Sequence, residues 1–262
     1  HKQFHCKLDG IHIISGGLGG LGLMTASVLV KMFGAKYLIL ISRSGKVRED
    51  NKMEVDMMTE LRKHATLYIL KCDASDDKVI GKVNKVVNST GLPVSGIISA
   101  AGSIDDNLIP NHNWDQFKTV VNTKMKAAWN MHKVSLNKNI QYFIAFSSTA
   151  SVASPGQINH SYASALLETL IEYRIKMGLP GTSIGWGRVN DIGFAAANMH
   201  EHDLSGSITP NDARSIISAN IYRSCADPIK WYAGRQNLLS VFSKFKSHNK
   251  ALNELVAAIN SV

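Results

Sequence analysis

The chain has 262 residues, of which 45% are hydrophobic and 19% charged, and its formal net charge is +9 at pH 7. This length and apolar content suit one α/β domain with a sizeable core, and they exclude a disordered, collagenous or coiled-coil chain. The longest apolar stretch, Val28–Ile41, is interrupted by two lysines and a glycine. No segment therefore reaches the roughly 20 apolar residues that a membrane span needs.

The excess of positive charge indicates an anionic partner or ligand. The lysines and arginines are scattered along the chain and form neither a basic arm nor a stripe interleaved with aromatic residues. This distribution disfavours a nucleic-acid-binding function. A phosphate-rich cofactor or an acidic protein partner fits it better.

The three cysteines, Cys6, Cys72 and Cys225, are odd in number and widely spaced. This argues against a disulfide framework and against a zinc cluster, so we predict no metal site and a reducing, cytoplasmic location. The chain begins with His1, and no charged-then-apolar signal sequence follows. We expect residues 1–262 to be a single domain excised from a longer multidomain protein.

Apolar runs rich in Val and Ile alternate with longer amphipathic stretches. Strands are predicted over Ile11–Ser15, Tyr37–Ile41, Thr66–Leu70, Ser95–Ser99, Tyr142–Ser147, Gly181–Trp186 and Lys230–Ala233. Helices are predicted over Gly20–Phe33, Met53–His64, Asp76–Ser89, Trp114–Ser135, His160–Met177 and Asn211–Tyr222. The alternation predicts an α/β, doubly wound Rossmann-type parallel sheet of about seven strands with helices on both faces. The ligand of such a fold lies beyond the carboxyl ends of the strands.

One long stretch, from Arg188 to Thr209, has no regular pattern. Loops of this length are usually functional, and this one follows a predicted strand, so we predict that residues 188–209 form a lid over the substrate. His200 and His202 lie in this stretch beside acidic residues. We interpret them as part of a solvated polar loop rather than as metal ligands.

A glycine-rich turn separates the first predicted strand from the first predicted helix. Glycines at such a turn let the backbone approach a pyrophosphate, whose charge then meets free N–H groups and the helix dipole. This strand–turn–helix context predicts dinucleotide binding. The candidate residues are Ser15, Gly16, Gly17, Leu18, Gly19, Gly20, Leu21 and Gly22.

The residues after the second predicted strand indicate which dinucleotide is bound. Ser42, Arg43 and Ser44 stand where an acid would bind the ribose 2′-hydroxyl of NAD. Because an arginine at this place accommodates a 2′-phosphate, we predict NADPH as the cofactor.

The ends of the next two predicted strands complete the cofactor site. Cys72 and Asp73 end the third, where an acid can reach the adenine edge. Ala100, Ala101 and Gly102 end the fourth, where small residues would let the ribose lie against the backbone.

Together these features resemble the short-chain dehydrogenase/reductase superfamily, and more narrowly the ketoreductase domain of modular polyketide synthases and animal-type fatty acid synthases. The resemblance covers most of the chain up to Trp186. Besides the turn and the strand ends above, it is carried by Phe146-Ser147-Ser148, Ser154-Pro155-Gly156-Gln157, Tyr173-Arg174, Gly178-Leu179-Pro180 and Gly185-Trp186-Gly187. It implies a multifunctional enzyme of lipid or polyketide metabolism in which NADPH reduces a β-ketoacyl thioester tethered to acyl carrier protein, alongside other synthase domains.

The resemblance also implies catalytic residues. Lys124 matches the family's lysine, and Ser148 matches the serine that hydrogen-bonds the substrate carbonyl. Ile104-Asp105-Asp106 resembles the Leu-Asp-Asp signature of ketoreductases that give the B-type alcohol configuration.

The proton donor departs from the family pattern. Counting from Gln157, and also back from Gly178, places His160 at the family's tyrosine and Ser164 at its asparagine. Tyr162 is two residues further on, about 200° around a helix, so it should face elsewhere. The family's separation between the serine and the tyrosine, counted from Ser148, ends between His160 and Tyr162. A local bulge would bring Tyr162 into the site.

Three functions therefore stay open. The first is an NADPH-dependent β-ketoacyl reductase with His160 or Tyr162 as proton donor. The second is a catalytically silent ketoreductase-like domain that binds cofactor or serves a structural role in a megasynthase. The third is a separate reductase or epimerase of free small molecules, because Gly16, Gly19 and Gly22 also fit the glycine spacing of extended superfamily members.

Overall fold

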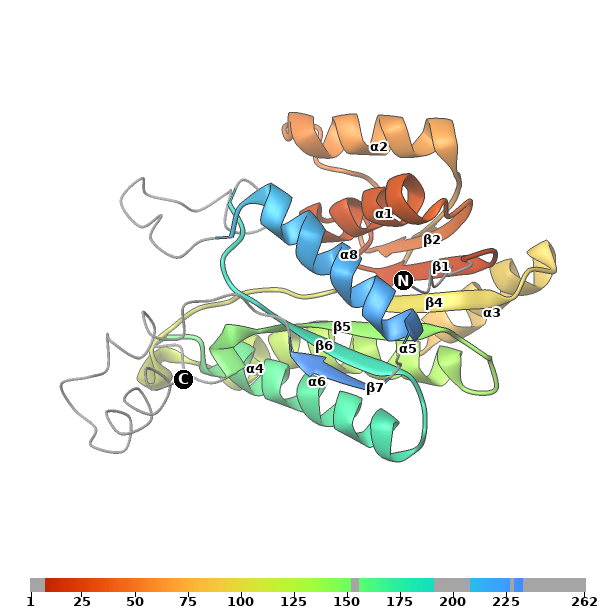
Figure 1. Cartoon of the computed structure of the whole chain (residues 1–262). Coiled ribbons are helices and arrows are strands. Elements are labelled where there is room, and N and C mark those ends of the chain that lie inside the picture. Colours follow the sequence, from red (N-terminus) through yellow and green to blue (C-terminus); the bar gives the residue numbers. More distant parts are fainter. Residues whose placement is uncertain (1–7, 152–155, 191–207, 227–228, 233–262) are drawn as a thin grey trace, which may run out of the picture.

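The chain folds around one parallel β-sheet. A computed structural model describes residues 8–151, 156–190, 208–226 and 229–232. Its seven strands lie in the order β3-β2-β1-β4-β5-β6-β7, and every neighbouring pair is parallel (Figure 1). The strands are β1 Ile11–Ser15, β2 Tyr37–Ser42, β3 Thr66–Lys71, β4 Val94–Ser99, β5 Tyr142–Ser148, β6 Gly181–Trp186 and β7 Ile229–Tyr232. The prediction of a doubly wound Rossmann-type fold is confirmed.

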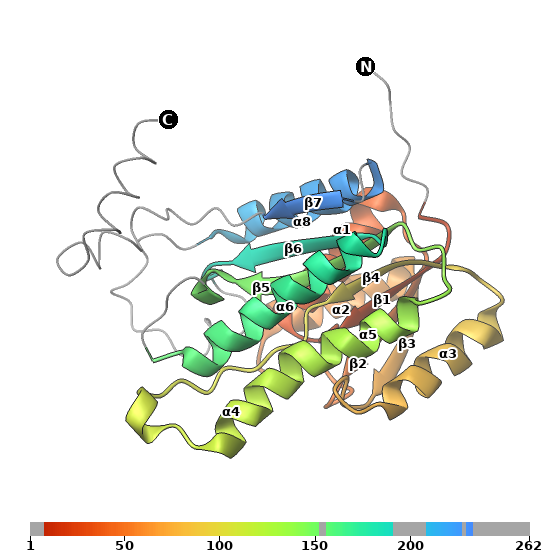
Figure 2. The same ribbon diagram turned by 90° about the horizontal axis from the view of Figure 1, so that it is seen from below.

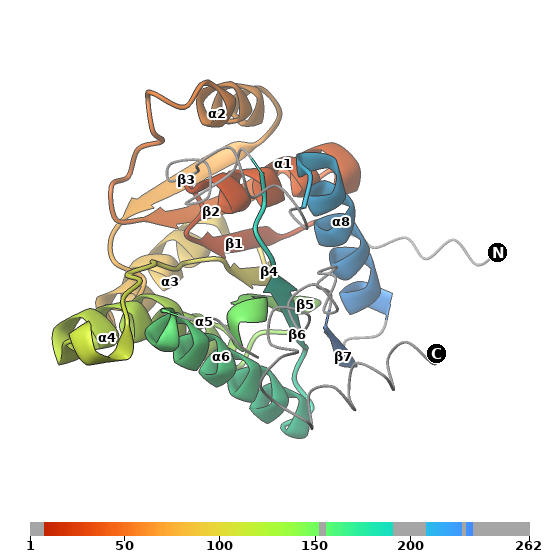
Figure 3. The same ribbon diagram turned by 90° about the vertical axis from the view of Figure 1, so that its left-hand side faces the viewer.

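Helices cover both faces of the sheet. In the two views of Figures 2 and 3, α1, α2 and α8 lie on one face, and α3, α4, α5 and α6 lie on the other. These helices are α1 Gly20–Phe33, α2 Lys52–His64, α3 Lys78–Thr90, α4 Trp114–Val121, α5 Ala127–Ser135, α6 Ile158–Lys176 and α8 Pro210–Ala226. Within the described ranges, no helix is both long enough and apolar enough to cross a bilayer.

Alternating side chains of the strands build two cores, one on each face. Ile14 and Leu40 pack with α1 and α8, whereas Ile13 and Ile41 pack with α3, α5 and α6. All four residues are fully buried. A strand covered on both faces needs apolar residues at every position, which is why these strands read as continuous Val and Ile runs.

The strand order reverses at β1, which pairs with β2 on one side and β4 on the other. Ser15, the last residue of β1, is level with Ile41 and Ser99 on these neighbours. In open parallel sheets the ligand crevice opens at the carboxyl ends of the strands, at such a reversal. This geometry places the glycine turn at the expected ligand site.

The helix predicted over Trp114–Ser135 is continuous but not uniform. A π-helical turn, Asn122–Lys126, separates α4 from α5. The extra residue per turn shifts the facing of the side chains around Lys124, and π turns are frequent at functional sites. The apolar pattern of the sequence does not predict this π-helical turn.

Cys225 is disulfide-bonded, whereas Cys72 is free. An odd number of cysteines argues against a framework of several bridges and leaves room for one. Cys6 lies outside the described residues.

Most of the predicted lid, residues 191–207, also lies outside the described residues. Its two ends are held side by side in a short parallel bridge between Val189 and Ile208. The amide of Ile208 donates to the carbonyl of Arg188, and the amide of Asn190 donates to the carbonyl of Ile208.

Candidate active site

The turn between β1 and α1 is closely packed. Gly16 has a positive φ of 70°, and the Gly17 amide donates to the carbonyl oxygen of Ile41 at 3.0 Å. A Cβ atom on Gly22 would lie 2.2 Å from the Gly16 carbonyl oxygen, and one on Gly17 would lie 2.9 Å from that of Ile14. Only glycine permits this approach of helix to strand.

The first turn of α1 can receive an anion. Its N-cap is the exposed Gly19, which has no capping side chain, and the turn has no acidic residue. The first amide groups of a helix lack partners inside the helix, and its positive dipole end faces the same way. The tight glycine cradle and these amides fit a pyrophosphate. Ser15, Leu18 and Gly20 are buried and shape the turn.

The end of β2 presents a free cation. Arg43 is exposed, and its side chain makes no hydrogen bond or ion pair with any residue that the structure describes. Ser42 and Ser44 flank it with their hydroxyl oxygens 3.1 Å apart. Arg43 is therefore available to a phosphate group.

The ends of β3 and β4 lie at the same edge of the sheet as the glycine turn, because the strands are parallel. The amide of Ala100 donates to the Ser15 carbonyl oxygen, which brings the end of β4 against the glycine turn. A Cβ atom on Gly102 would meet nothing within 4 Å. The Asp73 carboxylate accepts hydrogen bonds from the amide and the hydroxyl of Ser75, both at 2.8 Å, which orients it at the strand end beside Cys72.

The π-helical turn buries Lys124, whose exposed fraction is 3%. Its ammonium group donates a 2.9 Å hydrogen bond to the hydroxyl of Ser164, which donates at 2.7 Å to the carbonyl of His160. Burial lowers the pKa of Lys124 to about 7, and the negative charge of Glu168 opposes this shift. The lysine therefore releases its proton far more readily than an ordinary lysine does.

Ser148 ends β5, at the level of Trp186 on β6. Its hydroxyl lies 3.4 Å from the Trp186 carbonyl oxygen and accepts from the Ala150 amide at 3.2 Å. The neighbouring Ser147 donates to the Glu168 carboxylate at 2.7 Å and lies 3.3 Å from the Ser164 carbonyl oxygen. The end of β5 is thus joined to the face of α6 that contacts Lys124.

His160 lies in this group with an unused ring nitrogen. Its Nδ1 is buried and has no hydrogen-bond partner in the described part of the chain. Burial, the nearby charge of Lys124 and an opposing bond to the Ser103 backbone set its pKa at about 3. The imidazole is therefore neutral at physiological pH. Its unused nitrogen is a polar group that a ligand can satisfy.

Tyr162 points elsewhere. It is 49% exposed, and its ring packs against Phe117 of α4 with the centroids 5.4 Å apart. The structure brings together Lys124, His160 and Ser164, and it places Tyr162 on another side of α6.

The loop after β4 is tied to the start of α6. Asn159, fully buried, donates to the Asp105 carbonyl oxygen at 2.7 Å, and Gln157 donates to the Asp106 carboxylate at 2.6 Å. These contacts hold His160 in place. Asn159 and Glu168 were not among the residues predicted from sequence. One signal was available for Glu168, which stands one helical turn after Ser164.

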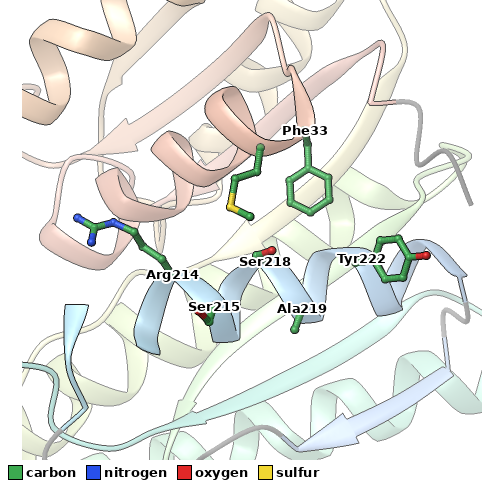
Figure 4. Close-up of a pocket in the computed structure, with 7 residues that line it drawn as sticks. Phe33, Arg214, Ser215, Ser218, Ala219 and Tyr222 are labelled. Carbon is green, nitrogen blue, oxygen red and sulfur yellow. The ribbon is translucent and has the colours of Figure 1, made fainter. Parts of the chain in front are cut away.

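A separate surface hollow lies at the other end of α1, far along the helix from the glycine turn (Figure 4). Phe33 and Met32 line it from α1, and residues of α8 from Arg214 to Tyr222 line it from the other side. None of these residues belongs to the predicted site.

The comparisons with known proteins agree with this architecture. The family model described as KR domain matches residues 10–191. The chain therefore belongs to the KR family, the ketoreductase domains of polyketide synthases.

The proteins similar to this chain include large polyketide synthases. The chain is 34% identical over 198 residues, 75% of its length, to a phenolphthiocerol synthesis polyketide synthase type I of Mycobacterium bovis. A similar match of 34% is to a Mycobacterium tuberculosis synthase whose name places its activity in doubt, and one of 33% is to an erythronolide synthase of Saccharopolyspora erythraea. The chain spans only 9%, 12% and 5% of these relatives.

Solved structures of ketoreductases are also similar to this chain. An A1-type ketoreductase superposes with a TM-score of 0.76 at 25% identity, covering 88% of this chain and 48% of that chain. The first ketoreductase of the tylosin polyketide synthase gives 0.67 at 26% identity, covering 82% and 47%.

Proposed function

We propose that the chain catalyses the NADPH-dependent reduction of a β-ketoacyl thioester, presented by acyl carrier protein, to the β-hydroxyacyl form. The observation that carries the proposal is the buried Lys124 ammonium group, held 2.9 Å from the Ser164 hydroxyl beside His160 at the rim of a Rossmann-type sheet. A buried cation at this edge is placed to stabilise an oxygen that becomes negative.

NADPH, when bound, supplies the hydride that reaches the carbonyl carbon. The first-turn amides of α1 would hold its pyrophosphate, and Arg43 would hold its 2′-phosphate. The closely packed glycine turn supports this assignment, because Gly17 and Gly22 leave no room for side chains.

The chain's own side chains would handle the carbonyl oxygen. The Ser148 hydroxyl would donate a hydrogen bond to it, and the neutral His160 would donate through Nδ1–H, in the tautomer that carries its single ring proton on Nδ1. Lys124, with a pKa of about 7, is the acid of the site that would supply the proton that this oxygen takes up, and the resulting neutral amine would take a proton back from water. Ser164 positions the ammonium group for this role.

The test is NADPH consumption with a β-ketoacyl thioester, comparing the parent with His160→Phe and Tyr162→Phe. We expect His160→Phe to lose at least about 100-fold in kcat, as removal of a hydrogen-bond donor to a developing oxyanion does, and Tyr162→Phe to retain activity. Loss only in Tyr162→Phe would contradict the assignment of His160. Arg43→Ala should weaken NADPH binding, and unchanged binding would overturn the cofactor assignment.

One observation favours a silent, cofactor-binding domain as a second candidate. The cationic form of His160 is unavailable at neutral pH because its pKa is about 3, so a strong acid is missing at the tyrosine position. Tight NADPH binding without turnover of any β-ketoacyl thioester would establish this second function.

A further inference from the structure

Glu168 shares one face of α6 with two residues of the site. It stands one turn after Ser164 and two turns after His160, a spacing that lines side chains up along a helix. One carboxylate oxygen accepts the Ser147 hydroxyl at 2.7 Å, and Ser147 immediately precedes Ser148 at the end of β5.

Glu168 also supplies a negative charge that stabilises the Lys124 ammonium group. Among the described residues, Glu168 is the carboxylate whose negative charge favours the ammonium form of Lys124. The other titratable group facing that ammonium is His160, also on α6 and neutral at physiological pH. Ser164 and Ser147, which complete the surroundings from α6 and β5, do not titrate in this range. A buried ammonium group without a countercharge loses its proton, because desolvation disfavours its charged form.

We propose that Glu168 is a positioning residue of the reductase site, which favours the charged form of Lys124 and ties the Ser147–Ser148 end of β5 to α6. This inference rests on the proposed function for its catalytic consequence. Its electrostatic part is independent of turnover, because it concerns the ionisation of Lys124 in the protein alone.

The chain offers a matched control. Glu172 is one turn further along α6 and exposed, so Glu172→Gln removes the same charge from the same helix without touching Lys124. The experiment is an NMR titration of the side chains in protein labelled with ¹³C at the lysine Cε atoms. The Lys124 resonance is assigned by its disappearance in Lys124→Met.

We expect the Lys124 titration midpoint to fall by about one pH unit in Glu168→Gln and to stay in place in Glu172→Gln. If the parent reduces a β-ketoacyl thioester, the pH of half-maximal kcat at the alkaline limb, where the Lys124 ammonium loses its proton, should fall by the same amount. If Glu168→Gln does not fold, Glu168→Asp should show a smaller shift in the same direction.

An unchanged Lys124 midpoint in the folded Glu168 variant would overturn the inference, and it would assign Glu168 a purely structural bond to Ser147. A parent that shows the titration shift but no turnover would refute the proposed reductase function and leave the electrostatic role intact.

Discussion

Each end of α6 contributes one residue to a buried pair of a cation and a histidine, and the two pairs have different hydrogen-bond partners. Near its amino end, Lys124 is buried beside His160, and near its carboxyl end, Arg174 is buried beside His132. In each pair burial and the neighbouring cation lower the histidine pKa, to about 3 for His160 and about 4 for His132. Each end therefore holds a cation next to a neutral imidazole.

The hydrogen bonds at the two ends of α6 differ. Arg174 donates to the Pro180 carbonyl at 2.8 Å, to the Ser135 hydroxyl at 2.7 Å and to Nδ1 of His132 at 2.8 Å. Its guanidinium group also lies 3.9 Å from the centroid of the Phe143 ring. Nδ1 of His160 has no such partner in the described part of the chain. At Arg174, Nε and Nη1 are paired, and Nη2 is buried without a partner among the described residues. A largely satisfied cluster fixes the structure, whereas the unpaired imidazole nitrogen of His160 retains hydrogen-bonding capacity for a ligand.

The two cations also differ in how readily they lose a proton. Burial lowers the pKa of Arg174 only to about 10, so it stays charged at neutral pH. Lys124, with a pKa of about 7, changes charge in the physiological range. A guanidinium group suits a permanent structural clamp, and an amine suits a group that exchanges protons.

The largest effect expected from this comparison is on stability at the carboxyl end. Arg174→Met leaves the Pro180 carbonyl and the Ser135 and His132 side chains without their donor, so we expect the free energy of unfolding to fall by about 3 kcal/mol. Urea unfolding measures it, with the exposed Lys176→Met of the same helix as control. Equal stability of the two variants would show that the clamp is not structural.

A smaller difference should separate the two histidines. His132→Phe removes an acceptor of a buried guanidinium group and should cost about 1–2 kcal/mol. His160→Phe removes an unpartnered nitrogen and a bond to the Ser103 backbone, so it should cost less stability than His132→Phe. The same unfolding experiment tests both, and an equal loss in the two variants would mean that Nδ1 of His160 is satisfied after all.

The smallest expected effect is on the pH dependence of the free energy of unfolding. His132 has a pKa of about 4 in the folded chain and an ordinary value of 6.5, so the unfolded chain binds protons first as the pH falls through 6.5. Stability is therefore lost on acidification. Lowering the pH from 7 to 6 should cost about 0.7 kcal/mol for each histidine buried in the neutral form. His132→Phe should show a shallower dependence, and an unchanged slope would contradict the burial of neutral His132.

Much of the fold could be predicted from local patterns. The strands Ile11–Ser15 and Gly181–Trp186 were predicted with their observed bounds, because a buried parallel strand must be apolar throughout. The helical rotation between His160 and Tyr162 predicted that they face different ways, and the Tyr162 ring lies on Phe117. Helix ends were less accurate, because capping and fraying depend on neighbours as well as on the local sequence.

The amino-acid sequence alone determined the alternation of strands and helices, the glycine turn and therefore a Rossmann-type ketoreductase framework, since all of these depend on residues close together in the chain. Only the tertiary structure decided which side chains share the site. Lys124 meets Ser164, which lies 40 positions further along the chain, and the π-helical turn that presents Lys124 has no periodic signal. The contacts around Glu168 and Arg174 arise in the same way, from packing between elements that the sequence places far apart.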